Sequence, residues 1–207
     1  NLEALEKGLP NLLQHVENIT KQFGLPAVVA INRFPTDTKA ELALVEEKCR
    51  ELGVNVALSE VWGKGSEGGE ALAEEVLRLI EQPNDFTYIY EDDMSIEEKI
   101  SAIATKIYRA DRVIYTPAAK KQLATIKGLG VENLPVCMAK TQYSLSDDAK
   151  LLGRPENFDI HIREVYVNAG AGFVVALTGA IMTMPGLPKV PAANGIDVED
   201  GKITGLF

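Results

Sequence analysis

Cysteine is scarce in this sequence of 207 residues: only Cys49 and Cys137 occur. Neither belongs to a Cys-x-x-Cys pair or to a Cys/His cluster, so a disulfide scaffold and a zinc site are both poorly supported. Cys49 falls on the apolar stripe of an expected helix, where a small core residue is the simplest interpretation. This usage of cysteine favours a reducing compartment, and we expect no metal ligands in this chain.

Basic residues are also in deficit, with 21 Lys plus Arg against 30 Asp plus Glu and a net charge of −9. This balance argues against non-specific binding to nucleic acid or to anionic membranes, although it is compatible with a local basic pocket for an anion. The longest strongly apolar stretch, residues 173–184, is too short to span a bilayer and contains Gly179. No signal peptide is visible. We therefore expect a cytoplasmic protein with neither a nucleic-acid partner nor a membrane partner.

Common motifs of nucleotide binding and nucleophilic catalysis are absent too. No Gly-x-x-x-x-Gly-Lys-Ser/Thr run occurs, and residues 168–172 (Asn-Ala-Gly-Ala-Gly) are more simply a strand turn than an anion cradle. His15 and His161 have no carboxylate and nucleophile at a motif spacing, so a hydrolase triad is not supported. Residues 32–37 resemble only faintly the base-reading Asn-Lys-x-Asp element of GTP-binding proteins, which makes a GTPase-type module a weak alternative.

The sequence does contain a regular alternation of strand and helix patterns. Hydrophobic residues make up 46% of the chain, enough to build one large domain or two small ones. Short links between strands and helices are typical of parallel sheets with crossover helices. We predict an α/β fold with two small, mostly parallel lobes, residues 1–93 and 94–207. Asn1 already lies inside a helical pattern, so we expect the chain to be part of a longer polypeptide.

In the first lobe, apolar residues at 3-4-3-4 spacing predict a helix from Leu2 to Phe23 that ends at Gly24. Pro10 should kink this helix or divide it in two, and docking on its own domain is favoured over a coiled coil. The remaining expectations are a strand over 26–34 with both faces buried, a helix from the capping box Thr38–Glu41 to Gly53, a strand over 54–61, a loop over 62–69, a helix over 72–80, and either a short strand or a passage between lobes over 82–93.

The second lobe repeats the alternation. Its helices should begin at the Ser95–Glu98 capping box and at Thr116, which precedes Pro117. Strands are expected over 111–115, 134–140, 158–163 (half exposed) and 173–177, with a helix ending near Gly128, a turn over 168–172 and a last hairpin at Asp200-Gly201.

Two aromatic residues stand where consecutive strands end. Phe34 follows the first expected strand and Trp62, the only tryptophan, follows the second. Ligands bind at the carboxyl ends of strands in open α/β sheets, and two aromatic rings there can sandwich a flat ring. The alternative is that Phe34 plugs the end of the sheet, or that the two rings pack on each other as a core pair. The adjoining loops, which contain Pro or several Gly, favour a ligand site.

Several longer motifs carry a resemblance to a known family. They are Ala-Ile-Asn-Arg-Phe-Pro-Thr-Asp-Thr (30–38), Glu-Val-Trp-Gly-Lys-Gly-Ser-Glu-Gly-Gly (60–69), Tyr-Thr-Pro-Ala-Ala (115–119), Ala-Lys-Thr-Gln-Tyr-Ser-Leu-Ser (139–146), Val-Asn-Ala-Gly-Ala-Gly-Phe (167–173) and Met-Pro-Gly-Leu-Pro-Lys-Val-Pro-Ala-Ala (184–193). Together they closely resemble the C-terminal part of formate–tetrahydrofolate ligase, over essentially the whole chain.

The resemblance implies part of a larger phosphate-loop (P-loop) ligase that uses ATP with Mg²⁺, formate and tetrahydrofolate. Formate is phosphorylated to formyl phosphate, which the folate amine attacks to give 10-formyltetrahydrofolate. By resemblance, Phe34 and Trp62 sandwich the pteridine ring, with Pro35 and Leu58 nearby.

The family's phosphate loop and formyl phosphate site belong to a missing N-terminal part, so the resemblance places no catalytic residue in this chain. Arg154, Pro155 and Asn168 are expected to border the nucleotide. We expect a homotetramer in the whole protein, partnership with the N-terminal part, and no ligase activity in this chain alone. The alternative is an assembly segment that packs on the N-terminal part or another subunit and binds no ligand.

Overall fold

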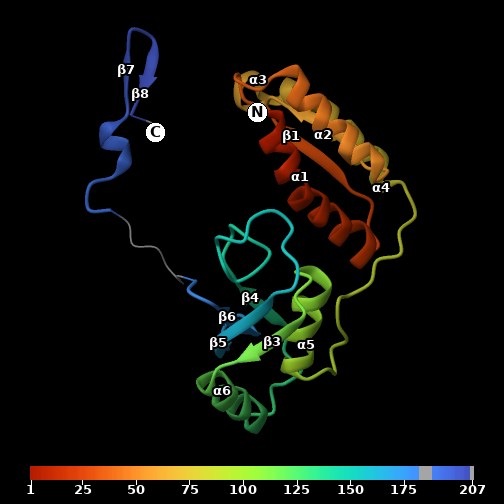
Figure 1. Ribbon diagram of the computed structural model, residues 1–207, viewed down its shortest axis with the longest axis vertical. Helices are drawn as coiled ribbons and strands as arrows, with labels where there is room; N and C mark the ends of the chain where they lie inside the picture. Colours follow the sequence, from red (N-terminus) through yellow and green to blue (C-terminus); the bar gives the residue numbers. More distant parts are fainter. Residues whose placement is uncertain (182–187, 206–207) are drawn as a thin grey trace.

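The computed structural model describes residues 1–181 and 188–205, which form a mixed α/β fold (Figure 1). Its sheets are mostly parallel and its helices connect the strands, so the predicted fold class is confirmed. Residues 184–187 of the 184–193 motif lie outside the described residues. Within the described part, no helix is long and apolar enough to cross a membrane.

Helix α1 (Leu2–Glu17) starts at Asn1, whose side chain accepts a hydrogen bond from the Ala4 amide. The π-helix η1 (Asn18–Gln22) continues it, and Gly24 follows with a φ of +65° that suits glycine. Pro10 lies inside α1 without dividing it, so that part of the expectation is wrong. Val16 packs with Val29 in the first core, which confirms docking on the chain's own domain.

The first sheet contains β1 (Val28–Asn32) and β2 (Asn55–Ser59), which pair in parallel. Helix α2 (Lys39–Glu51) connects them, and both hydrogen bonds of its capping box are present. Cys49 is buried in the core between α1, α2 and the sheet, as predicted. The expectation that both faces of the first strand are buried is wrong, because Val29 is buried whereas Ala30 is exposed.

The segment after β2 is more ordered than the expected loop. It forms the short helix α3 (Val61–Lys64) and the 3₁₀ helix η2 (Gly65–Gly69), followed by α4 (Glu70–Ile80). The Glu60 carbonyl accepts from the amides of Gly63 and Lys64, which starts the helical turn. Residues 81–95 contain neither helix nor strand, so the short strand that was one of two expectations for residues 82–93 does not form.

The second sheet is built from β3 (Arg112–Tyr115), β4 (Val136–Ala139), β5 (Asp159–Asn168) and β6 (Phe173–Thr178), in the strand order β3-β5-β6-β4. Its outer pairs are parallel and the central β5–β6 pair is antiparallel, because the tight turn after Asn168 joins β5 and β6 as a hairpin. The core contains Ile100, Ile160 and Val174. The helices of this part are α5 (Ile96–Ala102), the π-helix η3 (Ile103–Ile107) and α6 (Pro117–Gly128).

The described C-terminal residues form the 3₁₀ helix η4 (Ala192–Gly195) and the hairpin of β7 (Asp197–Glu199) and β8 (Lys202–Thr204). Asp200 and Gly201 both have positive φ, as a two-residue turn between antiparallel strands requires. The predicted hairpin is therefore confirmed. Figure 1 shows it apart from the two larger sheets.

Candidate functional site

The site expected from the sequence lies where β1 and β2 end. Asn32 and Ser59 are register partners in this parallel pair, so both strands end at the same edge of the sheet. Phe34 and Trp62 follow directly, with 57% and 63% of their surfaces exposed. Both rings are therefore available to a ligand, and the prediction that they lie at one edge and are not buried in the core is confirmed.

A tight turn holds Phe34 at this edge. The Phe34 amide donates to the Asp37 carboxylate over 2.8 Å, and the Asp37 amide donates to the Phe34 carbonyl over 3.0 Å. Pro35 occupies the second position of the turn, where its fixed φ is favoured. The turn aims the Phe34 side chain outward before α2 begins.

Trp62 is fixed from the neighbouring strand end. Its indole Nε1 donates to the Arg33 carbonyl over 2.6 Å, a bond that joins the chain after β1 to the chain after β2. Aromatic pairs among the described residues are Phe23–Phe86 and Phe86–Tyr88, so the rings of Phe34 and Trp62 do not stack on each other. Neither ring is paired with another aromatic ring in the described part of the chain.

Three charged side chains brace the same edge. The Arg33 guanidinium donates to one Glu60 carboxylate oxygen over 2.7 Å, and the Lys64 ammonium donates to the other over 2.5 Å. The Lys64 hydrogen bond, together with the charge of Arg33, lowers the pKa of the Glu60 carboxyl. Glu60 therefore stays ionised and ties the two strand ends and α3 together.

These residues surround an open cavity of about 360 Å³. This volume lies within the range of small-molecule sites, which are lined mainly by apolar groups with a few polar ones. Aromatic faces and paired charges together suit a flat heterocycle with hydrogen-bonding edges. The lining residues are Arg33, Phe34, Pro35, Glu60, Trp62, Gly63 and Lys64.

Gly68 brings the end of the 60–69 segment into contact with its start at Glu60. The Glu60 amide donates to the Gly68 carbonyl over 2.9 Å. A Cβ at Gly68 would stand 2.5 Å from the Glu60 carbonyl group, closer than any real contact allows. Only glycine lets this turn approach the end of β2, so Gly68 supports the position of Glu60 and, next to it, of Trp62.

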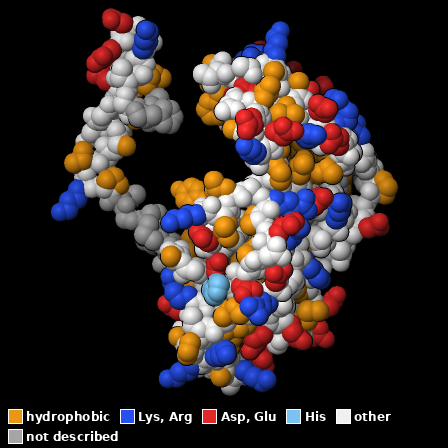
Figure 2. Space-filling view, viewed as in Figure 1, with side chains coloured by type: hydrophobic (Ala, Val, Ile, Leu, Met, Phe, Trp, Pro, Cys, Tyr) orange, Lys and Arg blue, Asp and Glu red, His pale blue; other side chains and the backbone are white. Residues whose placement is uncertain are grey.

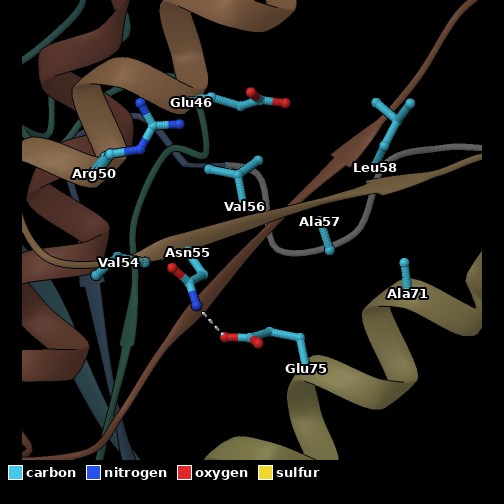
Figure 3. A pocket seen from close by; sticks show the side chains of 9 residues that line it. All are labelled: Glu46, Arg50, Val54, Asn55, Val56, Ala57, Leu58, Ala71 and Glu75. Carbon is cyan, nitrogen blue, oxygen red and sulfur yellow. Dashed lines mark hydrogen bonds between the residues drawn. The ribbon is translucent and has the colours of Figure 1, made fainter.

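Leu58, also expected at the folate site, lies elsewhere in the structure. It lines a separate cavity of about 360 Å³ along the outer edge of β2, between α2 and α4. Figure 3 shows Leu58 and Val56 on the side of Glu46, and Ala57 on the side of Ala71. The structure thus brings Phe34, Pro35 and Trp62 together around one cavity and places Leu58 beside another.

Arg154 and Pro155, expected near the nucleotide, are half-buried at the junction between α1 and the second sheet. The Arg154 guanidinium donates to the Glu17 carboxylate over 2.6 Å. Burial raises the pKa of Glu17, but hydrogen bonds and charges from Lys21 and Arg154 outweigh it and lower that pKa overall. In this arrangement Arg154 acts as a partner of α1.

Asn168, the third of these residues, is exposed at the far end of β5. Its carbonyl accepts from the amides of Ala171 and Gly172, which form the β5–β6 turn. Arg154 precedes the start of this strand of 10 residues. The two ends of β5 are about 30 Å apart. Since Arg154 precedes one end and Asn168 stands at the other, the structure does not bring them into one pocket.

The histidines remain outside any catalytic triad. His15 is exposed, and His161 Nδ1 lies 3.0 Å from the Asp147 carboxylate, a pairing that spacing in the sequence did not reveal. Among described residues, no hydrogen bond joins His161 to a hydroxyl group. The described part of the chain also holds no group of three or more His, Cys, Asp or Glu residues arranged to bind a metal ion.

Arg33, Glu60 and Lys64 line the cavity as well, and no sequence motif pointed to them. Each lies within two residues of Phe34 or Trp62. Charged side chains at two adjacent strand ends were the available signal, but their pairing depends on the register of β1 with β2.

Fold and geometry together define an α/β protein with an open, aromatic-lined cavity at the carboxyl ends of two parallel strands. A family model described as formate–tetrahydrofolate ligase matches residues 1–207, the whole chain. The chain therefore belongs to this family of ligases, which act in one-carbon metabolism on formate, tetrahydrofolate and ATP.

Proposed function

We propose that this chain supplies much of the tetrahydrofolate-binding site of an ATP-dependent ligase that makes 10-formyltetrahydrofolate from formate by way of formyl phosphate. The observation that carries the proposal is the placement of Phe34 and Trp62, both half-exposed, at one sheet edge around a cavity. The pteridine ring is the flat heterocycle that the two rings would hold, with Pro35 beside them. Leu58 is also proposed to lie near the bound pteridine. Because it lines a separate cavity along β2, its side chain would have to move when the ligand binds.

The phosphate chemistry is proposed to reside outside these 207 residues. The sequence has no phosphate-loop motif, and phosphoryl transfer needs backbone amides, a lysine and Mg²⁺ placed around the transferred group. The residues of this chain do not fit the Mg²⁺–ATP phosphates, so we assign no step of that transfer to them. We propose Arg154 and Pro155 as the residues of this chain that contact the nucleotide. Asn168 lies at the other end of β5, so it would have to contact the nucleotide at a different place.

Calorimetric titration of the purified chain with tetrahydrofolate tests the proposal. Trp62→Ala should weaken binding by about 1–3 kcal/mol, the scale of aromatic–base stacking, or about five-fold to more than 100-fold. Phe86→Ala is the matched control, because Phe86 is also an exposed aromatic residue but lies in the segment between the sheets. Equal affinities for all three proteins would remove Trp62 from the folate site. No binding to any of them would favour the alternative of an assembly segment.

A further inference from the structure

Helix α4 presents an apolar stripe to solvent. Val76, Leu77 and Ile80 are 42%, 61% and 65% exposed, and Ala73 is exposed beside them. Positions 73, 76, 77 and 80 lie on one face of a helix, the pattern by which helices normally dock. The buried residue of α4 is Leu79, which lies outside this stripe, and the helix itself packs on β2. The stripe is thus a second apolar face, and Figure 2 shows hydrophobic side chains reaching the surface of this lobe.

The sheet beside this stripe is also uncovered. Ala71 and Glu75 of α4 lie over the outer edge of β2 (Figure 3), so the opposite face of the helix is directed toward the β1 side. On that side Ala30 is exposed, whereas its register partner Ala57 on β2 is buried. Parallel strands are normally covered by helices on both faces. Space for one further helix therefore lies next to α4, over β1.

The rim of the stripe is acidic. Glu70, Glu74 and Glu81 adjoin it on the helix surface, and none of them takes part in an ion pair among the described residues. Arg78, the basic residue of this helix, is already bonded to Glu75 through two hydrogen bonds of 2.8 and 2.6 Å. A helix docked here would meet uncompensated negative charge along its flank.

Two other occupants, a second copy of this chain and the chain's own C-terminal hairpin, fit this surface poorly. In an antiparallel pair of α4 helices from two copies, a twofold axis would bring one acidic rim against the other. The chain's own C-terminal hairpin carries Asp197, Glu199 and Asp200, which would add to the same charge.

We infer that the stripe of α4 and the exposed face of β1 form a docking surface for an amphipathic α-helix whose apolar stripe is flanked by Lys or Arg, supplied by a polypeptide segment outside these 207 residues. Apolar side chains on Val76, Leu77 and Ile80 provide the buried area, and the three free glutamates select the basic flank. This inference does not depend on the folate site, which lies at the end of the strands rather than over them.

A pair of designed peptides tests the surface. Each has about 18 residues, enough for a helix, with the same Leu/Ala stripe, and they differ only in carrying Lys or Glu along the flanks. Each is titrated into the 207-residue chain by calorimetry, with hydrogen exchange followed over residues 28–32 and 70–80. The Lys-flanked peptide should bind and protect both segments, and the Glu-flanked peptide should bind roughly tenfold or more weakly.

Variants separate this docking from general charge attraction. Ile80→Ser should weaken binding of the Lys-flanked peptide roughly tenfold or more. Helix α4 should stay folded, because Ile80 is exposed. Leu129→Ser is the matched control, since Leu129 is also 65% exposed but follows α6 in the second lobe. Glu74→Lys should shift the preference toward the Glu-flanked peptide. Absent binding, equal binding to the Ile80→Ser variant, or a chain that dimerises in sedimentation until Ile80 is replaced would each overturn the inference.

Discussion

Lys140 is half-buried, and its ammonium group lies among backbone carbonyls. It donates to the Thr141 carbonyl over 2.7 Å and to the Ser144 carbonyl, and it lies 5.1 Å from the centre of the Tyr108 ring. Burial lowers the pKa of Lys140 to about 8, although the charge of Asp147 opposes this shift. The residue thus holds the 140–145 segment in place while carrying a charge that its surroundings disfavour.

Stability should consequently respond to pH through this residue. Between about pH 8 and 10.5 the unfolded chain binds more protons at Lys140 than the native chain, so the contribution of Lys140 to stability rises with pH. Urea unfolding of the wild type and of Lys140→Met at about pH 7.5 and 10 measures this, because other titrating groups cancel in the difference. The wild type should gain relative to the variant at the higher pH. A constant or opposite difference would contradict the pKa assigned to Lys140.

At the scale of residues, the sequence predicts which side chains reach the site better than how they pair. Phe34 and Trp62 could be placed because each follows the end of an expected strand, and parallel strands end at the same edge. Arg33 and Glu60 are 27 residues apart, and their pairing over 2.7 Å requires the register of β1 with β2. No local pattern specifies that register.

Elements with local signals were predictable. The capping boxes at Thr38 and Ser95 form as expected, since each is completed within four residues. The segment 62–69 was expected as a loop because its glycines favour turns, but contacts with the end of β2 fold it into α3 and η2. The antiparallel centre of the second sheet likewise depends on which strands meet, which alternation along the chain does not specify.

Gly68 provides a test of how η2 supports the site. Gly68→Ala should displace Glu60, because its new Cβ would stand 2.5 Å from the Glu60 carbonyl group. Tetrahydrofolate binding should then weaken roughly tenfold while the second sheet stays folded. Gly128→Ala is the control, since a Cβ at Gly128 meets no atom within 4 Å. If both variants bind like the wild type, the close approach of Gly68 to Glu60 has no part in the site.

At the scale of the molecule, we propose the boundary near residue 93 as the division between the two lobes. The end of α1 and the start of η1 nevertheless contact the second part of the chain, because the Glu17 carboxylate binds Arg154 and the Asn18 side chain donates to the Ile107 carbonyl over 3.0 Å. Periodicity along the chain could not predict these contacts. It specifies neither that the first helical segment contacts both parts of the chain nor that Arg154 pairs with Glu17.

A folate site between Phe34 and Trp62 can be tested by following tetrahydrofolate binding through the tryptophan fluorescence of the 207-residue chain. Trp62 is the only tryptophan, so selective excitation of tryptophan makes the signal report on the proposed site. Saturable quenching is expected in the wild type. The affinity should fall about five-fold or more in Phe34→Ala, where one stacking face is lost, and stay unchanged in Phe86→Ala. Quenching of equal strength in both variants, or no saturable quenching at all, would contradict a folate site between Phe34 and Trp62.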